Sequence, residues 1–534
     1  MQEFIAKHQE EIQGWMSGFD RLVFTGALHG LDICQWDAEL QALRATAMEQ
    51  YLWHNDIKFM DYAEHVKDVS GRIKVAAAKP FQKAGLPVIY LPSPETDKDA
   101  TARQIALERG IQEGLVCILG STELHPSFEH RRTIIVRRKR PCHVQYLYQI
   151  HPEVGWMYAR MQTWFPFRIQ VGLNGREWLA HRMRREKLQF RQADHCFVWI
   201  EDYARAQELL NQQVRTHWTE LLAGLARQLN PLHESIFAKY PMDYSWTCEQ
   251  SEWATDIVFH RAEYLRRLMP RLVRQGMLSF HSPDVMRFLG KRVNQSGAVP
   301  GGFNGELKID LKRRQEGERV KFYMNGNSAK FYDKAYSEFG SVLRGAETTL
   351  NHARDLKAYR PKQGGPEQDL QWRPLRKGIA DVYRRTEISQ AANNRLLDAL
   401  ARVDDSRTVA ELTATIQQPT PWKGRRVRAL HPWGADHALL SALNHGNFIL
   451  NGMRNRDLQA LLYEQPASPV SERRRRSAAI SRKLRLLRAH GLLQKVPRTH
   501  RYQITAEGRS ILLSILTTAR TSLQQLNQLE EYAA

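Results

Sequence analysis

Residues 472–505 constrain the fold more than any other part of the chain, because they predict a basic amphipathic helix followed by a short hairpin. Gly491 is a helix stop, and residues 492–496 and 502–505 have the composition of two strands. Before that glycine, apolar side chains recur at helical spacing and predict a helix over 477–490 with one packing face: Ile480, Leu484 and Leu487. We therefore expect a helix, two strands and a basic loop between the strands.

This order resembles the winged helices of bacterial regulators of the MarR-like class, in which a recognition helix precedes a basic wing. Residues 436–443 and 455–463 predict the two shorter helices that such a domain needs, with Asn455 as an N-cap. The closing pattern Y-x-h-T-x-x-G of that class is present as Tyr502, Ile504, Thr505 and Gly508. The resemblance implies a winged-helix DNA-binding domain over residues 434–534.

The positive charge of the chain is concentrated in the same region. Residues 421–509 contain 18 Lys or Arg and 5 Asp or Glu, in a chain of formal net charge +21. Basic side chains on a helix gain affinity for nucleic acid by releasing counterions from phosphates. As an alternative, the arginine run is a solvated stretch without a partner. We expect these side chains to contact DNA: Arg473, Arg474, Arg475, Arg476, Arg482, Lys483, Arg485, Arg488, Arg498 and Arg501.

The composition of the 534-residue chain, with 42% apolar residues, is typical of a multidomain globular protein. Its five cysteines are scattered without a C-x-x-C pair, so neither a zinc knuckle nor a disulfide framework is expected. No apolar run approaches the roughly 18 residues of a membrane span, and the polar N-terminus predicts no secretion signal. We expect a bacterial cytoplasmic, nucleoid-associated protein. DNA is the expected partner, RNA is the alternative, and a terminal helix over 517–531 would allow a homodimer.

The predicted elements favour an α+β, multidomain chain. Asp20 and Glu123 lie at predicted strand ends, where carboxylates either hold magnesium or cap the chain and meet solvent. The segments that we expect are an α/β domain (1–130), an antiparallel β region (131–200), a helical connector (201–296), a second β region (297–360), a helical or linker region (361–433) and the winged helix (434–534).

The antiparallel region mixes aromatic and basic side chains on its predicted strands. This composition lets a sheet stack bases and hold a nucleic-acid backbone, although the same rings could simply fill the core of the sheet. The residues concerned are His143, Tyr146, Tyr148, Trp156, Tyr158 and Arg160.

The second β region contains a tyrosine between lysines, which suits phosphoryl transfer. A phenol can attack a DNA phosphate, cations can steady the transition state, and a carboxylate can bind a metal. We expect Tyr332, Lys334 and Glu347 to be catalytic, and Mg²⁺ or Mn²⁺ to be held by Asp310, Asp333 and Glu347. As an alternative, Tyr332 and Lys334 are cross-strand partners in a half-exposed sheet, and Arg344 and Glu347 form an ion pair.

The same segment resembles the "S-x-x-x-x-x-Y-x-K … L-R-x-E" pattern of rolling-circle replication initiators, whose tyrosine is the nicking nucleophile. The resemblance implies the same role for a tyrosine of this segment and a metal-binding role for its acids. The pair of histidines one residue apart that this family uses is absent, because none of the 20 histidines forms an H-x-H pair. A metal site built on histidine is therefore not expected.

As a whole, the chain resembles a widespread bacterial family of large, often multicopy proteins. Two motifs carry this resemblance, Gln162-Thr163-Trp164-Phe165-Pro166-Phe167 and Asn174-Gly175-Arg176-Glu177-Trp178. The resemblance implies association with mobile DNA.

Two functions are consistent with the sequence. The first is a DNA-binding protein of a mobile element that nicks or rejoins DNA. The second is a regulator or chaperone that binds nucleic acid without cutting it. A metabolic enzyme has no support, because the sequence contains no P-loop, no G-x-G-x-x-G after a strand, no H-E-x-x-H and no G-x-S-x-G.

Overall fold

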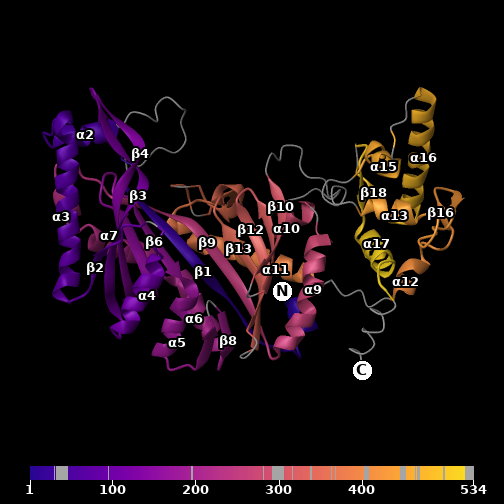
Figure 1. The fold of residues 1–534 in the computed structure, drawn as a ribbon, viewed down its shortest axis with the longest axis horizontal. Coiled ribbons are helices and arrows are strands. Elements are labelled where there is room, and N and C mark those ends of the chain that lie inside the picture. Colours follow the sequence, from indigo (N-terminus) through magenta and orange to yellow (C-terminus); the bar gives the residue numbers. More distant parts are fainter. Residues whose placement is uncertain are drawn as a thin grey trace. The chain divides into compact units, whose positions relative to one another are not determined.

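The protein mixes helices with one large β-sheet (Figure 1). The structure is a computed structural model, and it describes residues 1–28, 31, 46–93, 95–193, 196–278, 280, 282–291, 306–314, 317–336, 340–362, 364–366, 368–401, 408–444, 453–463, 465, 469–496 and 499–522. No helix within these ranges is long and apolar enough to cross a membrane.

The chain forms two compact units. The first, which we call the sheet unit, comprises Glu10–Leu265 and Gly326–Asn393. The second, the C-terminal unit, comprises Met1–Gln9, Arg266–Asn325 and Asn394–Ala534. The division falls within two helices, α9 (Ala262–Leu278) and α11 (Val382–Ala401).

The sheet of the first unit has the strand order β12-β13-β9-β1-β6-β5-β4-β3-β2. Neighbouring strands are antiparallel where their pairing is described, except for the parallel pair β2 and β3. The bounds are β1 (Ile12–Leu28), β2 (Val88–Tyr90), β3 (Gly114–Arg131), β4 (Ile134–His151), β5 (Gly155–Gln162), β6 (Ile169–Asn174), β9 (Tyr244–Phe259), β12 (Asn327–Tyr336) and β13 (Gly340–Leu350). Two small antiparallel ribbons complete the unit, β7 (Phe190–Ala193) with β8 (Cys196–Ile200) and β14 (Lys357–Arg360) with β15 (Gln371–Pro374).

Helices pack on both faces of this sheet, because neighbouring residues of a strand point to opposite faces. Leu147 of β4 packs in the core under α3, whereas Tyr146 and Tyr148 pack in the core under α4. A third apolar cluster joins β1 to α5 and α6. The helices of this unit are α2 (Thr46–His54), α3 (Tyr62–Lys83), α4 (Lys98–Glu108), α5 (Gly175–Arg185), α6 (Tyr203–Arg215), α7 (Trp218–Leu229) and α8 (His233–Ile236).

The structure corrects the prediction of a helical connector over 201–296, because β9 lies in the middle of that segment. Residues 253–259 of β9 are all buried between β1 and β13. A strand that is buried on both faces lacks the alternation that marks a half-exposed strand, so its periodicity does not separate it from a helix. The boundaries between the predicted segments also differ from the structure, since β1 pairs with β6 and β9.

The aromatic residues of the predicted antiparallel region fill a core, as the alternative interpretation had it. Tyr146, Tyr148 and Trp156 are buried beside Ala102 and Ala106 of α4. Their rings are therefore not available to stack on bases.

The C-terminal unit contains a core formed by its last helices and a hairpin. Helix α16 (Val470–Ala489) begins earlier than the predicted 477–490, so the run of four arginines lies within the helix. Pro469 precedes its first residue, and arginine has a high helix propensity. The other elements are α1 (Gln2–Lys7), α10 (Ser282–Phe288), β10 (Leu307–Arg314), β11 (Gly317–Met324), α12 (Val409–Ala414), β16 (Thr420–Trp422), β17 (Arg425–Val427), α13 (His437–Leu443), α15 (Asn455–Leu462), β18 (Leu493–Lys495), β19 (Tyr502–Ile504) and α17 (Ala506–Thr518).

Candidate functional site

Three carboxylates from three adjacent strands converge in the sheet unit. Asp20 of β1, Glu252 of β9 and Glu347 of β13 each have an oxygen within 4.8 Å of the other two. Glu347 is buried, whereas Asp20 and Glu252 are only partly buried and are reached from solvent.

Irregular pairing at this point of the sheet explains why the three side chains meet. The register between β1 and β9 shifts between Phe19 and Arg21, so that Asp20 is the extra residue. The pairing of β13 with β9 shifts between Arg344 and Ala346, and that of β12 with β13 shifts between Lys330 and Tyr332. A bulge redirects side chains and is common beside active sites. These shifts surround the three carboxylates.

Arg344 is the centre of the polar network, and it is fully buried. Its Nε and Nη2 donate to Asp256 at 2.7 and 3.2 Å, and its Nη1 lies 2.9 Å from Asp20 Oδ1 and 3.3 Å from Glu347 Oε2. Burial opposes the charge on Arg344, but Asp20 and Asp256 hold its pKa well above the usual value. The guanidinium therefore stays charged and fixes these carboxylates in place.

The motif Asn174-Gly175-Arg176 supplies a second buried cation. Asn174 caps α5 by accepting from the backbone N–H groups of Arg176 and Glu177 at 2.9 and 3.0 Å. A Cβ at Gly175 would lie 1.7 Å from the backbone oxygen of Phe19, so this position requires glycine. The cap and the close approach bring Arg176 to Asp256, where its Nη2 lies 2.8 Å from Oδ2.

Tyr332 meets Glu347 across the β12–β13 pair. Its phenol donates to Glu347 Oε2 at 3.0 Å, and Lys330 forms an ion pair with Oε1 of the same carboxylate. Lys330 and Arg344 also lie over the phenol ring, 5.7 and 5.6 Å from its centroid. Burial raises the pKa of Tyr332 well above 10, so the phenol ionises only if a base accepts its proton. Glu347 is placed to be that base.

Glu252 has the most useful titration in the cluster. Burial, with the Glu347 charge beside it, raises the pKa of Glu252 to about 7. The cations Arg176, Arg344 and Lys330 are matched by the carboxylates of Asp20, Asp256 and Glu347. The cluster is therefore neutral while Glu252 is protonated and gains a negative charge when Glu252 ionises.

The structure brings some of the predicted catalytic and metal-binding residues together and not others. Tyr332 and Glu347 are in contact, with Lys330 rather than Lys334 on Glu347. Lys334 is buried, and Asp333, the next residue along the strand from Tyr332, is buried as well. Asp310 lies in the β10–β11 hairpin, where it is 3.3 Å from Arg319. Among the described residues, the carboxylates that converge with Glu347 are Asp20 and Glu252.

Sequence reasoning missed Glu252, Asp256 and Arg176. Glu252 and Asp256 lie in the segment that was predicted to be helical, and Arg176 was noted only as part of a motif. Glu123, the other acid considered at a strand end, is occupied elsewhere, since it accepts from Tyr146 at 2.6 Å and pairs with Arg160 at 3.3 Å.

The C-terminal unit presents a second candidate surface on α16. The arginines 473, 474, 475, 482 and 485 are exposed, whereas Lys483, Arg476 and Arg488 are half-buried. Arg475 and Arg476 both pair with Glu472 at 2.8 Å, and Arg488 lies over the rings of Trp422 and Tyr502. Arg501, beside β19, is half-buried, and Arg498 lies outside the described residues.

Contacts with neighbouring elements fix α16 in the C-terminal unit. Asn455 is not the predicted N-cap, since the N-cap of α15 is Arg454. Its side chain instead donates to Ser477 O and Ser481 Oγ of α16, both at 2.9 Å. Gly491 ends the helix with a φ of 72°, and Thr505 caps α17 by accepting from the Gly508 N–H at 2.9 Å. The exposed arginines therefore stand on an anchored helix.

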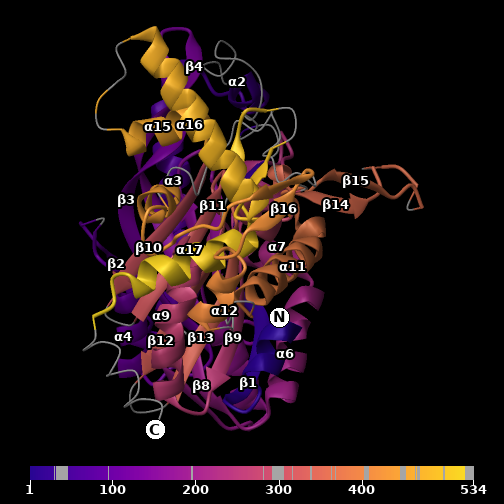
Figure 2. The ribbon, with the colours of Figure 1, turned by 90° about the vertical axis from the view of Figure 1, so that its right-hand side faces the viewer.

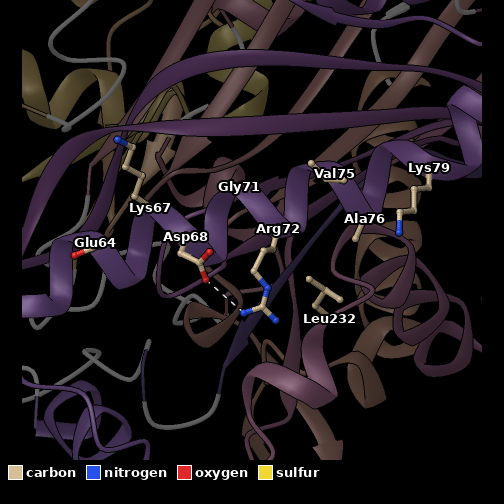
Figure 3. Close-up of a pocket in the computed structure, with 9 residues that line it drawn as sticks. All are labelled: Glu64, Lys67, Asp68, Gly71, Arg72, Val75, Ala76, Lys79 and Leu232. Carbon is tan, nitrogen blue, oxygen red and sulfur yellow. Dashed lines mark hydrogen bonds and ion pairs between the residues drawn. The ribbon is translucent and has the colours of Figure 1, made fainter.

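A surface hollow of about 750 Å³ lies along α3 (Figure 3). Lys67, Arg72 and Lys79 line it, and Arg72 pairs with Asp68 at 3.4 Å. These side chains are spread along the helix rather than aimed at one point, so the hollow does not form a chemical site.

Comparisons with protein-family models, with curated protein sequences and with solved structures gave no significant match.

Proposed function

We propose that this protein binds DNA through α16 and the β18–β19 hairpin, which together act as a winged helix. One observation carries this proposal: α16 buries Ile480, Leu484 and Leu487 in a core and exposes arginines along the rest of its surface. A helix fixed in this way presents its charges to phosphates with little loss of side-chain order.

The charge state of individual arginines supports the proposal further. The side chains of Arg473, Arg474, Arg482 and Arg485 form no ion pair or hydrogen bond with a described residue, whereas Arg475 and Arg476 are held by Glu472. Unpaired cations pay no cost of breaking an internal contact when they meet phosphate. Arg482 and Arg485 are therefore the best positions for a test, which is the salt dependence of DNA affinity in their alanine variants.

A second function, nicking or rejoining of DNA, is favoured by the contact of Tyr332 with Glu347. In this reaction the Tyr332 oxygen attacks the phosphorus of a phosphodiester, and one ester bond to a sugar oxygen breaks. The phenol proton passes to Glu347, and protonated Glu252 gives a proton to the leaving oxygen. Lys330 and Arg344 steady the negative charge on the phosphate. The products are a phosphotyrosine ester and a free hydroxyl.

A metal-dependent version of the reaction uses the same carboxylates. Asp20, Glu252 and Glu347 offer the oxygen ligands that Mg²⁺ and Mn²⁺ prefer, and a bound ion would supply positive charge beside the phosphate. The ion requires ionised Glu252, whereas proton donation requires its protonated form. Because the pKa of Glu252 is about 7, activity should rise with pH through that value in the metal version and fall in the other.

The experiment for this second function is a denaturing gel of labelled DNA incubated with the protein, with and without Mg²⁺ or Mn²⁺. A protein-linked product supports the tyrosine reaction, and metal-dependent cutting without an adduct supports a carboxylate nuclease. Tight binding without cutting leaves the regulator or chaperone function. The resemblance to multicopy bacterial proteins adds the proposal that the DNA belongs to a mobile element.

A further inference from the structure

The ribbon β14–β15 carries a pair of large aromatic side chains on its outer face. Tyr359 and Trp372 are directly opposite each other in the register, with ring centroids 5.6 Å apart. The two side chains are 55% and 58% exposed. Figure 2 shows β14 and β15 as a projecting ribbon. Large aromatic side chains are usually buried, so two of them exposed at one place indicate a surface that contacts a partner.

The alternation of side chains separates an outer face from an anchoring face. Lys357 and Tyr359 of β14 are exposed, whereas Ala358 and Arg360 are buried. Arg360 donates to the backbone oxygen of Pro374 through Nε and Nη2 at 3.2 and 2.7 Å, which ties the two strands together. The aromatic pair therefore lies on the face that is not used to hold the ribbon.

Asp381 fixes the base of the ribbon. It is fully buried, and it lies 3.0 Å from Arg376, 2.7 Å from Arg384 and 3.7 Å from Arg360. The chain just beyond the ribbon is bound to β9, since the Cys248 N–H donates to Lys377 O at 2.8 Å. The ribbon thus starts from a rigid base, and its outer face is presented in a defined direction.

The charge around the aromatic pair indicates the chemistry of the partner. Residues 357–377 contain six Lys or Arg and two Asp or Glu, and Lys357 and Lys362 are exposed. Aromatic rings that are surrounded by cations match the unpaired bases and phosphates of a single strand. In a duplex the bases are already stacked on one another, so their faces are not open to these rings.

We propose that the outer face of β14–β15 binds single-stranded DNA, with bases stacked on Tyr359 and Trp372 and phosphates near Lys357 and Lys362. This inference deepens the proposed DNA binding and rests on it. It adds a strand-selective surface in the sheet unit, separate from the basic helix of the C-terminal unit. A surface for another protein is the competing explanation, and a purely internal role in holding the ribbon is another.

The test measures the affinity of the full-length protein for a fluorescent oligothymidylate and for a duplex of equal length, at one fixed salt concentration. Tyr359→Ala and Trp372→Ala should each weaken single-strand binding about tenfold, because stacking of one base contributes a comparable free energy. Duplex binding should be unchanged. Tyr359→Phe and Trp372→Phe should bind the single strand nearly as well as the wild type, since they keep a stacking face.

Trp53 is the matched control, because it is 75% exposed on α2. Trp53→Ala should leave both affinities unchanged. The inference is overturned if the alanine variants of the ribbon bind the single strand like the wild type, or if they lose single-strand and duplex binding equally. An altered oligomeric state with unaltered DNA binding would assign the pair to a protein contact instead. The proposed function fails separately, through a wild-type protein that binds neither form of DNA.

Discussion

The phenol of Tyr332 donates a hydrogen bond to Glu347 across the β12–β13 pair, with 3.0 Å between the two oxygens. This contact places a weak nucleophile beside a base, and Lys330 and Arg344 surround the same ring. Without the neighbouring carboxylate, a buried phenol would keep its proton at neutral pH. The pair therefore has a chemical meaning only together with the network of charges around it.

Replacing Tyr332 with Phe should abolish any covalent protein–DNA adduct and leave DNA affinity unchanged. The variant removes the attacking oxygen but keeps the ring, so the fold should lose only about 1 kcal/mol from the missing hydrogen bond. The measurements are adduct formation on a denaturing gel and DNA affinity by anisotropy. An adduct of undiminished yield would refute the role of Tyr332.

Glu252 should make the protein less stable as the pH rises. Its pKa in the folded protein is about 7, above the unfolded value, so the folded state holds a proton that the unfolded state has lost between about pH 4.5 and 7. The stabilising effect of that proton is complete below the unfolded pKa and lost as pH rises through the folded one. Glu252→Gln should gain stability over the wild type across this window, by on the order of 3 kcal/mol at most. Chemical denaturation at a series of pH values measures the difference, and parallel pH profiles would contradict the assignment.

A divalent ion, if it binds, should bind at Asp20, Glu252 and Glu347. Manganese added to the wild type should then raise the unfolding temperature, by a free energy of about 2.7 kcal/mol at a hundredfold excess over its dissociation constant. Asp20→Asn should remove the effect. Asp310→Asn should keep it, since Asp310 pairs with Arg319 in a different hairpin. Loss of the effect in the Asp310 variant, or its persistence in the Asp20 variant, would exclude this set of ligands.

Gly175 should tolerate no side chain. A Cβ at this position would lie 1.7 Å from the Phe19 oxygen, and Phe19 precedes Asp20 in the chain. Gly175→Ala should therefore push α5 and Arg176 away from Asp256, at a cost of several kcal/mol, because a buried ion pair that loses one partner is strongly destabilised. Gly224→Ala in α7 is the control, because a Cβ there meets nothing within 4 Å, and it should be neutral or stabilising. Equal melting temperatures for the two variants would contradict this account.

Local patterns in the sequence predicted local structure well. The helix over α4, the strand β8 and the turn at Gly491 follow from short-range signals that few distant contacts override. Tyr332 and Glu347 could be paired in advance, because they lie on strands that follow each other in the chain.

The rest of the site depends on long-range register, which no local pattern contains. Asp20, Arg176 and Glu252 come from parts of the chain that are far apart, and a shift of one residue in the pairing of β1 with β9 would turn Asp20 to the other face of the sheet. The aromatic pair on β14–β15 was missed for a related reason. Tyr359 and Trp372 become opposite neighbours only when the two short strands pair.

The central claim is that α16 contacts DNA, and the salt dependence of duplex binding tests it most directly. Anisotropy of a labelled duplex should show that affinity falls with salt, and that Arg482→Ala together with Arg485→Ala weakens binding and reduces the magnitude of the slope by about 1.8. Arg313→Ala is the control, since Arg313 is 81% exposed but is paired with Glu318 on another hairpin. If the double variant has the affinity and slope of the wild type, α16 is not the DNA-binding surface.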